Sequence, residues 1–219
     1  MRKNLKIVLF IVAILIVSGG LVFGILVFTS WDTFEYSNTY YYEPSVPSPI
    51  EKVSFSSDVG KILINYNKTP TDSFVKLDLD IKIRGAFVEG KTFSDFFNPI
   101  VWLNESVPVV TFSITNKPWG LFALSQNITI DVTLRTDVVY DINALSSTGS
   151  VSLNIPENVA INNSILEAST GSISFITAKN VTFLGDVKVE TSTGSIAVFA
   201  KHNEFNQGIS AITSTGSIV

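Results

Sequence analysis

Two glutamates stand where a pair of carboxylates could act together. Glu167 and Glu190 each lie two residues before a Ser-Thr-Gly-Ser tetrad that recurs in the second half of the chain. Stacked carboxylates can bind a cation or work as a general acid and base. Leu145 and Ile212 take the same position before other tetrads, and no third acid joins the pair. The pattern therefore favours two outward-facing side chains that repel each other mildly.

The other residues suited to catalysis are scattered. Three further acids of the repeats fall mostly in different positions: Glu157, Asp186 and Glu204. His202 is the only histidine, cysteine is absent, and no Ser-His-Asp grouping is evident. We expect His202 to be a solvated turn residue, and we predict no catalytic residues, no cofactor and no metal site. An enzyme that cleaves polysaccharides on a β-helix is the least favoured alternative.

The tetrads must position these residues, because they recur at a nearly fixed spacing. Successive copies begin 22, 23 and 22 residues apart, which is typical of stacked repeats with one supersecondary unit per period. The copies are Ser147, Thr148, Gly149 and Ser150; Ser169, Thr170, Gly171 and Ser172; Ser192, Thr193, Gly194 and Ser195; and Ser214, Thr215, Gly216 and Ser217. We interpret each as a corner in which glycine adopts a positive φ and the hydroxyls bond to nearby backbone. Binding of ice, carbohydrate or another surface by these hydroxyls is the alternative.

Apolar and polar residues alternate around the tetrads, as in strands with one buried face. Each repeat is expected to hold a strand before the tetrad, a strand after it, and a third short strand, as at Val159–Ile161 and Val181–Phe183. A second corner is predicted at three asparagines, because asparagine tolerates the left-handed region: Asn158, Asn180 and Asn203. One inserted residue, Asp186, explains the longer second repeat. The expected fold class is all-β, a single-stranded β-helix or solenoid with about 22 residues per rung.

The N-terminus carries an uncharged run of 22 residues, Ile7–Phe28, which is long enough as a helix to cross a bilayer. Arg2, Lys3 and Lys6 precede this run, which places residues 1–6 in the cytoplasm and the rest of the chain outside. We predict an uncleaved single-pass anchor at residues 7–28, with a cleaved signal peptide as the alternative. Residues 29–50, rich in aromatic residues and proline, are expected to form a juxtamembrane linker.

The middle of the chain continues the strand pattern. Residues 51–127 are expected to form an N-terminal β region, and residues 128–219 the repeat region. Strands are predicted at Val53–Phe55, Lys61–Asn65, Val75–Arg84, Val109–Ile114 and Ile128–Leu134. Acids alternate with Lys and Arg on the polar face of Val75–Arg84, which favours a solvated surface over a calcium site. The aromatic segment Phe87–Trp102 is expected to be a long loop packed over one end of the sheet, or else a patch that binds a partner.

Composition narrows the classes of partner. The formal net charge is −4 and there is no basic stripe, so no nucleic-acid partner is predicted. Sequons for N-glycosylation occur at Asn67, Asn104, Asn127, Asn162 and Asn180, and they are usable only in a host that has the machinery.

The last repeat is incomplete, because only Ile218 and Val219 follow the fourth tetrad. An uncapped rung would expose apolar side chains and unpaired backbone groups. We expect either a fragment of a longer gene product or self-association through this open rung.

Asp131–Ser150, followed by repeated Ser-Thr-Gly-Ser-Ile with alternating Val and Ile, resembles the "putative adhesin" or toast-rack β-repeat family of prokaryotic cell-envelope proteins. The resemblance is good over residues 128–219 and loose over residues 51–127. It implies a β-solenoid with no enzymatic residues to transfer, and in many members an N-terminal membrane segment. The expected function is a non-catalytic binding or scaffolding module at the cell surface, with another envelope protein or a surface glycan as partner. A sensor or regulatory subunit of an envelope-stress system is the alternative.

Overall fold

The computed structural model describes the chain except residues 1–30, 68–72, 87, 104–108 and 119–122. The all-β class predicted from the sequence is confirmed, since the described residues contain one short helix and otherwise strands, turns and connections. Within this part of the chain, no helix is long and apolar enough to cross a membrane. The predicted cytoplasmic tail at residues 1–6 and the predicted span at residues 7–28 lie outside the described residues.

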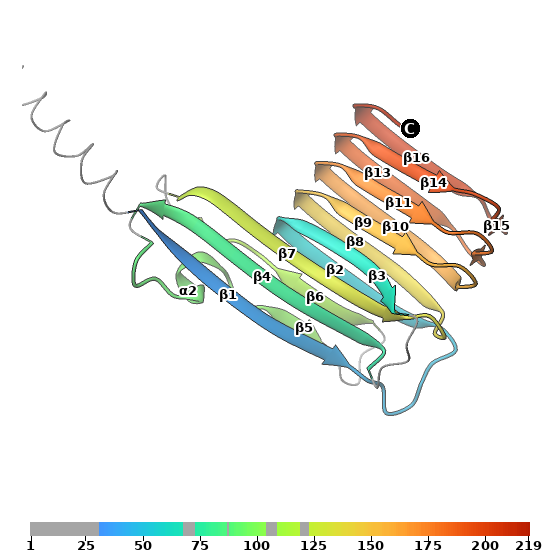
Figure 1. The fold of residues 1–219 in the computed structure, drawn as a ribbon, viewed down its shortest axis with the longest axis horizontal. Helices are drawn as coiled ribbons and strands as arrows, with labels where there is room; N and C mark the ends of the chain where they lie inside the picture. The colour runs from blue at the N-terminus through green and yellow to red at the C-terminus, as the bar shows by residue number, and fades with distance from the viewer. Residues whose placement is uncertain (1–30, 68–72, 87, 104–108, 119–122) are drawn as a thin grey trace, which may run out of the picture.

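Two sheets face each other across one apolar core (Figure 1). Sheet A has the strand order β1 (Trp31–Tyr42), β4 (Val75–Ala86), β7 (Ala123–Arg135), β3 (Lys61–Asn67), β9 (Val151–Ile155), β11 (Ile173–Thr177), β14 (Ile196–Ala200). Sheet B has the order β15 (Glu204–Phe205), β12 (Thr182–Phe183), β10 (Ala160–Thr170), β8 (Tyr140–Thr148), β2 (Glu51–Val59), β6 (Val110–Ile114), β5 (Val101–Leu103). Two further strands extend sheet B, with β13 (Val187–Thr193) beside β10 and β16 (Ile209–Thr215) beside β13.

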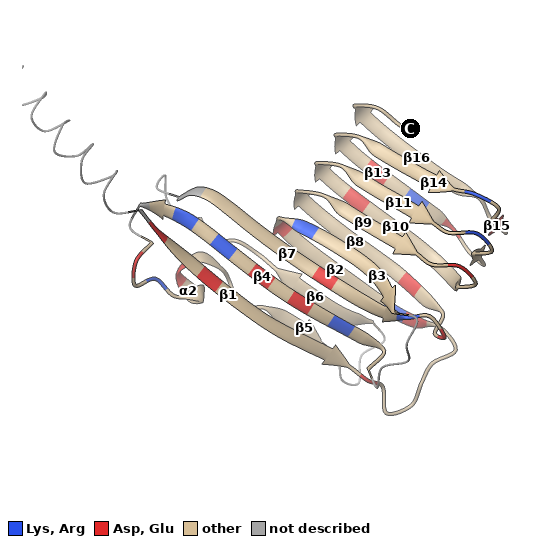
Figure 2. Ribbon diagram, viewed as in Figure 1, with Lys and Arg blue, Asp and Glu red and all other residues tan. Residues whose placement is uncertain are grey.

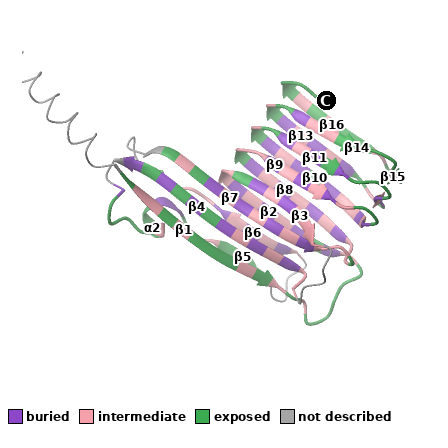
Figure 3. Cartoon of the chain, viewed as in Figure 1, coloured by how far each residue is buried: buried purple, intermediate pink, exposed green. Residues whose placement is uncertain are grey.

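Strict alternation of apolar and polar residues decides which side of each strand is buried (Figure 3). In β4, the apolar residues from Val75 to Ile83 are at most 2% exposed, while the charged residues between them face outward. Figure 2 shows these charges as a stripe along β4. Lys76 binds Asp78 at 2.6 Å and Lys82 binds Glu35 at 2.5 Å, in keeping with the predicted solvated face.

The repeats pair in parallel, like position on like position. In sheet B, Ala144 lies beside Leu166, Leu166 beside Val189, and Val189 beside Ala211. In sheet A, Ile173 lies between Val151 and Ile196. The apolar columns identified in the sequence are therefore ladders in the structure, and each repeat extends the apolar face that both sheets present to the core.

The first half departs from a uniform β-helix, because the sheets are mixed. β2 lies between β6 and β8, and β3 lies between β7 and β9, although β6 to β9 all follow them in the chain. β4 runs antiparallel to both β1 and β7. β7 also crosses the expected boundary between residues 127 and 128.

Two segments predicted as irregular form regular structure. Most of the predicted linker at residues 29–50 is the edge strand β1, in which Phe34, Tyr36 and Tyr40 pack against the core. The predicted loop Phe87–Trp102 contains the helix α2 (Phe93–Phe96) and the start of β5. Aromatic residues and threonine favour strands, and β1 pairs with β4 along its whole length, which the interpretation of residues 29–50 as a linker did not anticipate.

These aromatic residues close one end of the core. The rings of Phe34 and Phe96 are 5.0 Å apart, and those of Tyr40 and Trp102 are 5.6 Å apart. Phe96 and Phe97 are buried. The packed rings agree with a segment that covers one end of the sheet, and the alternative role as a partner-binding patch stays a prediction. Phe87 lies outside the described residues.

The third short strand of each repeat also differs in part. β12 at Thr182–Phe183 agrees with the prediction, and β15 is its counterpart in the next repeat. Val159–Ile161 is not a separate strand, because β10 runs continuously from Ala160 to Thr170 with a bulge between Ile161 and Ser164. Between Ile161 and Ser164, β10 has one residue more than the segment of β8 that it pairs with, and the bulge accommodates this residue without breaking the strand.

Candidate binding groove

A ladder of glycines forms the corner beside which the candidate site lies. Gly149, Gly171, Gly194 and Gly216 have φ values of 146°, 141°, 146° and 147°. The Gly171 N–H donates to the carbonyl of Thr193 at 2.8 Å, and Gly149 and Gly194 make the same bond to the next repeat. Gly60 extends the ladder into the first half, with φ 118° and a 2.8 Å bond to the carbonyl of Thr148.

Side-chain hydroxyls one residue before the tetrads form hydrogen bonds to the backbone carbonyls of the glycines at this corner. Ser146 donates to the carbonyl of Gly60 at 3.3 Å, Thr191 to that of Gly171 at 3.1 Å, and Thr213 to that of Gly194 at 3.3 Å. Sequence reasoning assigned this role to the tetrad hydroxyls and missed these three residues. The available signal was a hydroxyl residue one place before each tetrad, with Ala168 as the exception.

The second corner has left-handed residues at Asn158, Asn180 and His202, with φ values of 63°, 59° and 56°. The prediction of Asn203 for the third corner was therefore wrong by one residue. Thr177 pairs with Ala200, so the connection from the strand to the left-handed residue is one residue shorter in that repeat. Asn203 instead accepts a 3.0 Å bond from the Val181 N–H, and its amide contacts Thr177.

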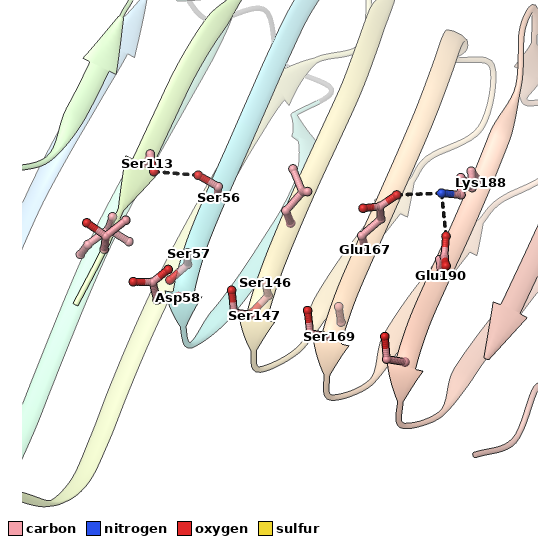
Figure 4. Close-up of a pocket in the computed structure, with 15 residues that line it drawn as sticks. Ser56, Ser57, Asp58, Ser113, Ser146, Ser147, Glu167, Ser169, Lys188 and Glu190 are labelled. Carbon is pink, nitrogen blue, oxygen red and sulfur yellow. Dashed lines mark hydrogen bonds and ion pairs between the residues drawn. The ribbon is translucent and has the colours of Figure 1, made fainter. Parts of the chain in front are cut away.

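A groove of about 350 Å³ runs along the outer face of sheet B, next to the glycine corner (Figure 4). We call it the serine groove. Its outer column crosses the strands at Asp58, Ser147, Ser169 and Ser192, and its inner column at Ser113, Ser56, Leu145, Glu167 and Glu190. Consecutive residues in each column come from neighbouring strands, so the groove follows the stacking direction. The first serine of three tetrads therefore lies in the groove.

Lys188 holds the two glutamates of the inner column together. Glu167 and Glu190 are directly opposite in the pairing of β10 and β13. The Lys188 Nζ lies 2.6 Å from Glu190 Oε2 and 2.9 Å from Glu167 Oε1. Hydrogen bonds that Lys188 donates to Glu190 and, to a smaller extent, to Glu167 raise the pKa of Lys188 above its ordinary value. The predicted repulsion is thus offset by a lysine that stands in another column of the repeat.

One ammonium group thus engages both glutamates of the inner column. The other three acids do not line the groove: Glu157 is in the turn after β9, Asp186 precedes β13, and Glu204 is on β15. Among the described residues, no group of three or more His, Cys, Asp or Glu side chains could hold a metal ion.

The end of the groove nearest β6 is fixed by hydrogen bonds. Asp58 Oδ2 accepts the Asn116 N–H at 2.9 Å, and Ser56 donates to Ser113 at 2.8 Å. Ser57 donates to the carbonyl of Val59 at 2.6 Å. Ser147, Ser169 and Ser192 are exposed. The groove therefore offers hydroxyl donors and acceptors on a rigid sheet, with three carboxylates against one ammonium group.

The predicted sequons lie in different settings. Asn127 is exposed on β7, Asn180 is exposed in the second corner, and Asn67 ends β3. The Asn162 amide donates to Asp141 at 2.7 Å. Asn104 lies outside the described residues. Glycosylation at these positions stays a prediction.

The comparisons with known proteins find solved structures at low sequence identity. No protein-family model matches the sequence, and no curated protein matches it. A crystal structure described as a "putative cell adhesion protein" from Clostridium sporogenes is 12% identical, with TM-score 0.44 over 84% of this chain and 98% of that one. A "putative adhesin" from Parabacteroides merdae is 8% identical, with TM-score 0.26 over 84% of this chain and 96% of that one. A "putative lipid binding protein" from Parabacteroides distasonis is 14% identical, with TM-score 0.23 over the same shares.

Proposed function

We propose that this chain is a non-catalytic binding module of the cell surface, anchored by residues 7–28 and facing outward. The observation that carries the proposal is the serine groove, in which side chains from β2, β6, β8, β10 and β13 converge on one outward-facing surface. Its attachment to the membrane is supported by the uncharged run Ile7–Phe28 and the basic residues before it.

The groove suits binding because its side chains are held by the fold. Each strand beneath it is hydrogen-bonded on both sides, so the columns keep a fixed spacing. The Glu167–Lys188–Glu190 cluster forms one wall, and Asp58 with the Ser56–Ser113 pair fixes the end nearest β6. A polar ligand would meet preformed hydrogen-bonding groups and would order few side chains on binding.

The full chain, reconstituted in liposomes, tests this proposal by co-sedimentation with cell-envelope fractions of the host. Ser169→Tyr fills the exposed middle of the groove without entering the core, and we expect it to abolish sedimentation. Ser174→Tyr is the matched control, because Ser174 is on β11 and faces outward on the opposite sheet. Equal sedimentation of both variants and the parent chain would refute a role for the groove.

The topology has its own test. Protease added to intact cells should digest the chain beyond Trp31 and leave the anchor in the membrane. Full protection, or release of soluble chain into the medium, would contradict the outward-facing anchored arrangement.

A further inference from the structure

The direction of the serine groove limits the shape of its ligand. The groove crosses β2, β8, β10 and β13, and neighbouring strands are about 4.8 Å apart. A ligand that uses both ends of the groove must therefore be extended and must present similar groups at each step. Asp58, Ser147, Ser169 and Ser192 supply one polar side chain per strand along this path.

The charges of the groove limit the chemistry of its ligand. Asp58, Glu167 and Glu190 line it with three carboxylates, and Lys188 is the one cation in the lining. The Lys188 ammonium already binds both glutamates, at 2.6 and 2.9 Å, so it is poorly placed to bind an anionic group of a ligand. An anionic polymer would meet a net negative surface.

An extended peptide fits this site less well than a chain of hydroxyl groups. Peptides that bind sheets commonly add a strand at an edge, where backbone groups are free. The groove lies on the face of sheet B, where β2, β8, β10 and β13 are each paired on both sides. Only side chains are available there, and those of the outer column are mainly hydroxyls.

We propose that the serine groove binds a linear, uncharged, hydroxyl-rich polysaccharide that lies along the stack, with about one sugar residue for each strand crossed. This inference rests on the proposed function and names its ligand class. Serine hydroxyls, which can donate and accept, bind the sugar hydroxyls, and the carboxylates accept from them. Leu145, half-buried in the inner column, offers an apolar contact between these polar groups.

Calorimetry on the full chain in detergent tests the ligand class with gluco-oligosaccharides of two to six residues, in β-1,4-linked and β-1,3-linked series. We expect at least one series to bind, with affinity rising about tenfold from two to four residues, because the two added subsites together can contribute a factor of that order. The affinity should then level off at the length of the groove. Oligogalacturonates of the same lengths, which are anionic, should bind at least about tenfold more weakly.

Three variants separate the possible outcomes. Ser169→Tyr should abolish oligosaccharide binding, and Ser174→Tyr should leave it unchanged. Glu167→Lys should narrow or reverse the preference against oligogalacturonates. Length-independent binding, a parent chain that prefers the anionic series, or no binding of either neutral series would overturn the inference. If the neutral series fail while envelope fractions still sediment in a Ser169-dependent way, the ligand class is wrong and the proposed function stands.

Discussion

A β-carbon placed on Gly171 would lie 1.7 Å from the carbonyl oxygen of Gly149 in the neighbouring repeat. The same close approach joins Gly149 to Gly60 at 1.7 Å and Gly216 to Gly194 at 1.8 Å. Glycine is therefore required at this corner both by its positive φ and by backbone contact between repeats. The first serine of each tetrad is held beside this contact, which gives the outer column of the groove its regular spacing.

Gly171→Ala should destabilise the protein more than a strained φ alone would. Strain at such a φ costs about 1–3 kcal/mol, and the overlap with Gly149 should add about 1–3 kcal/mol. Gly208→Ala is the control, because Gly208 has φ 113° but nothing within 4 Å of its added carbon. Denaturant unfolding followed by tryptophan fluorescence measures both. Equal losses for the two variants would contradict the backbone contact.

Ser164 and Ser146 should respond to the same substitution with opposite signs. Ser164 is 0% exposed and its hydroxyl has no hydrogen-bond partner among the described residues, so Ser164→Ala should be neutral or stabilising by about 1 kcal/mol. Ser146 is 3% exposed and bonds to Gly60, so Ser146→Ala should destabilise by about 1 kcal/mol. Unfolding midpoints that shift in the same direction would refute the difference between these sites.

Ala168 is the position where the inner hydroxyl ladder is interrupted. Ala168→Thr should place a hydroxyl near the carbonyl of Gly149, as Thr191 does for Gly171. Ala168→Val has nearly the same shape without the hydroxyl. We expect the threonine variant to be more stable than the valine variant by about 0.5–1.5 kcal/mol. A valine variant that is equally or more stable would exclude the bond.

Alkaline pH should destabilise the protein through tyrosines whose pKa is raised in the folded state. Burial raises the pKa of Tyr66 well above its ordinary value, and it raises the pKa of Tyr40 and Tyr42 to about 12. The native state then keeps protons that the unfolded chain releases above pH 10, so stability is full below about pH 10 and falls as the pH rises toward 12.

Tyr66→Phe isolates one of these groups. The Tyr66 hydroxyl is buried without a hydrogen-bond partner among the described residues, so its removal should flatten the alkaline loss and leave neutral stability intact. Tyr140→Phe should lower stability at neutral pH as well, since the Tyr140 hydroxyl donates to the carbonyl of Phe74 at 2.7 Å. Stability measured from pH 7 to 12 distinguishes the two, and an unchanged alkaline slope in Tyr66→Phe would contradict the assignment.

The repeat half could be predicted well because its information is local and periodic. A spacing of about 22 residues and an alternating pattern are enough to align Leu166 with Ala144 and Val189. The first half could not be predicted in the same way. The insertion of β2 and β3 between strands that follow them is a non-local pairing, and alternation within a strand carries no information about its neighbours.

The site was predicted only in its parts. The tetrad serines and the pair of Glu167 and Glu190 were identified from their columns, but their meeting in one groove depends on β2 and β6 from the first half. Lys188 was missed because it pairs with Ile165. It therefore belongs to a different column from the two glutamates that it binds. Side chains two residues apart on one strand share a face, and that rule could have found it.

The location of the binding site is the central claim, and the absence of cysteine from the chain allows a direct measurement of it. Single variants Ser169→Cys and Ser174→Cys of the full chain in liposomes would each carry one thiol, on opposite sheets. The rate of thiol modification is measured with and without the host envelope fraction. The account predicts that the fraction slows modification at position 169 and leaves position 174 unchanged. Equal rates at position 169 in both conditions, or protection of position 174 alone, would contradict it.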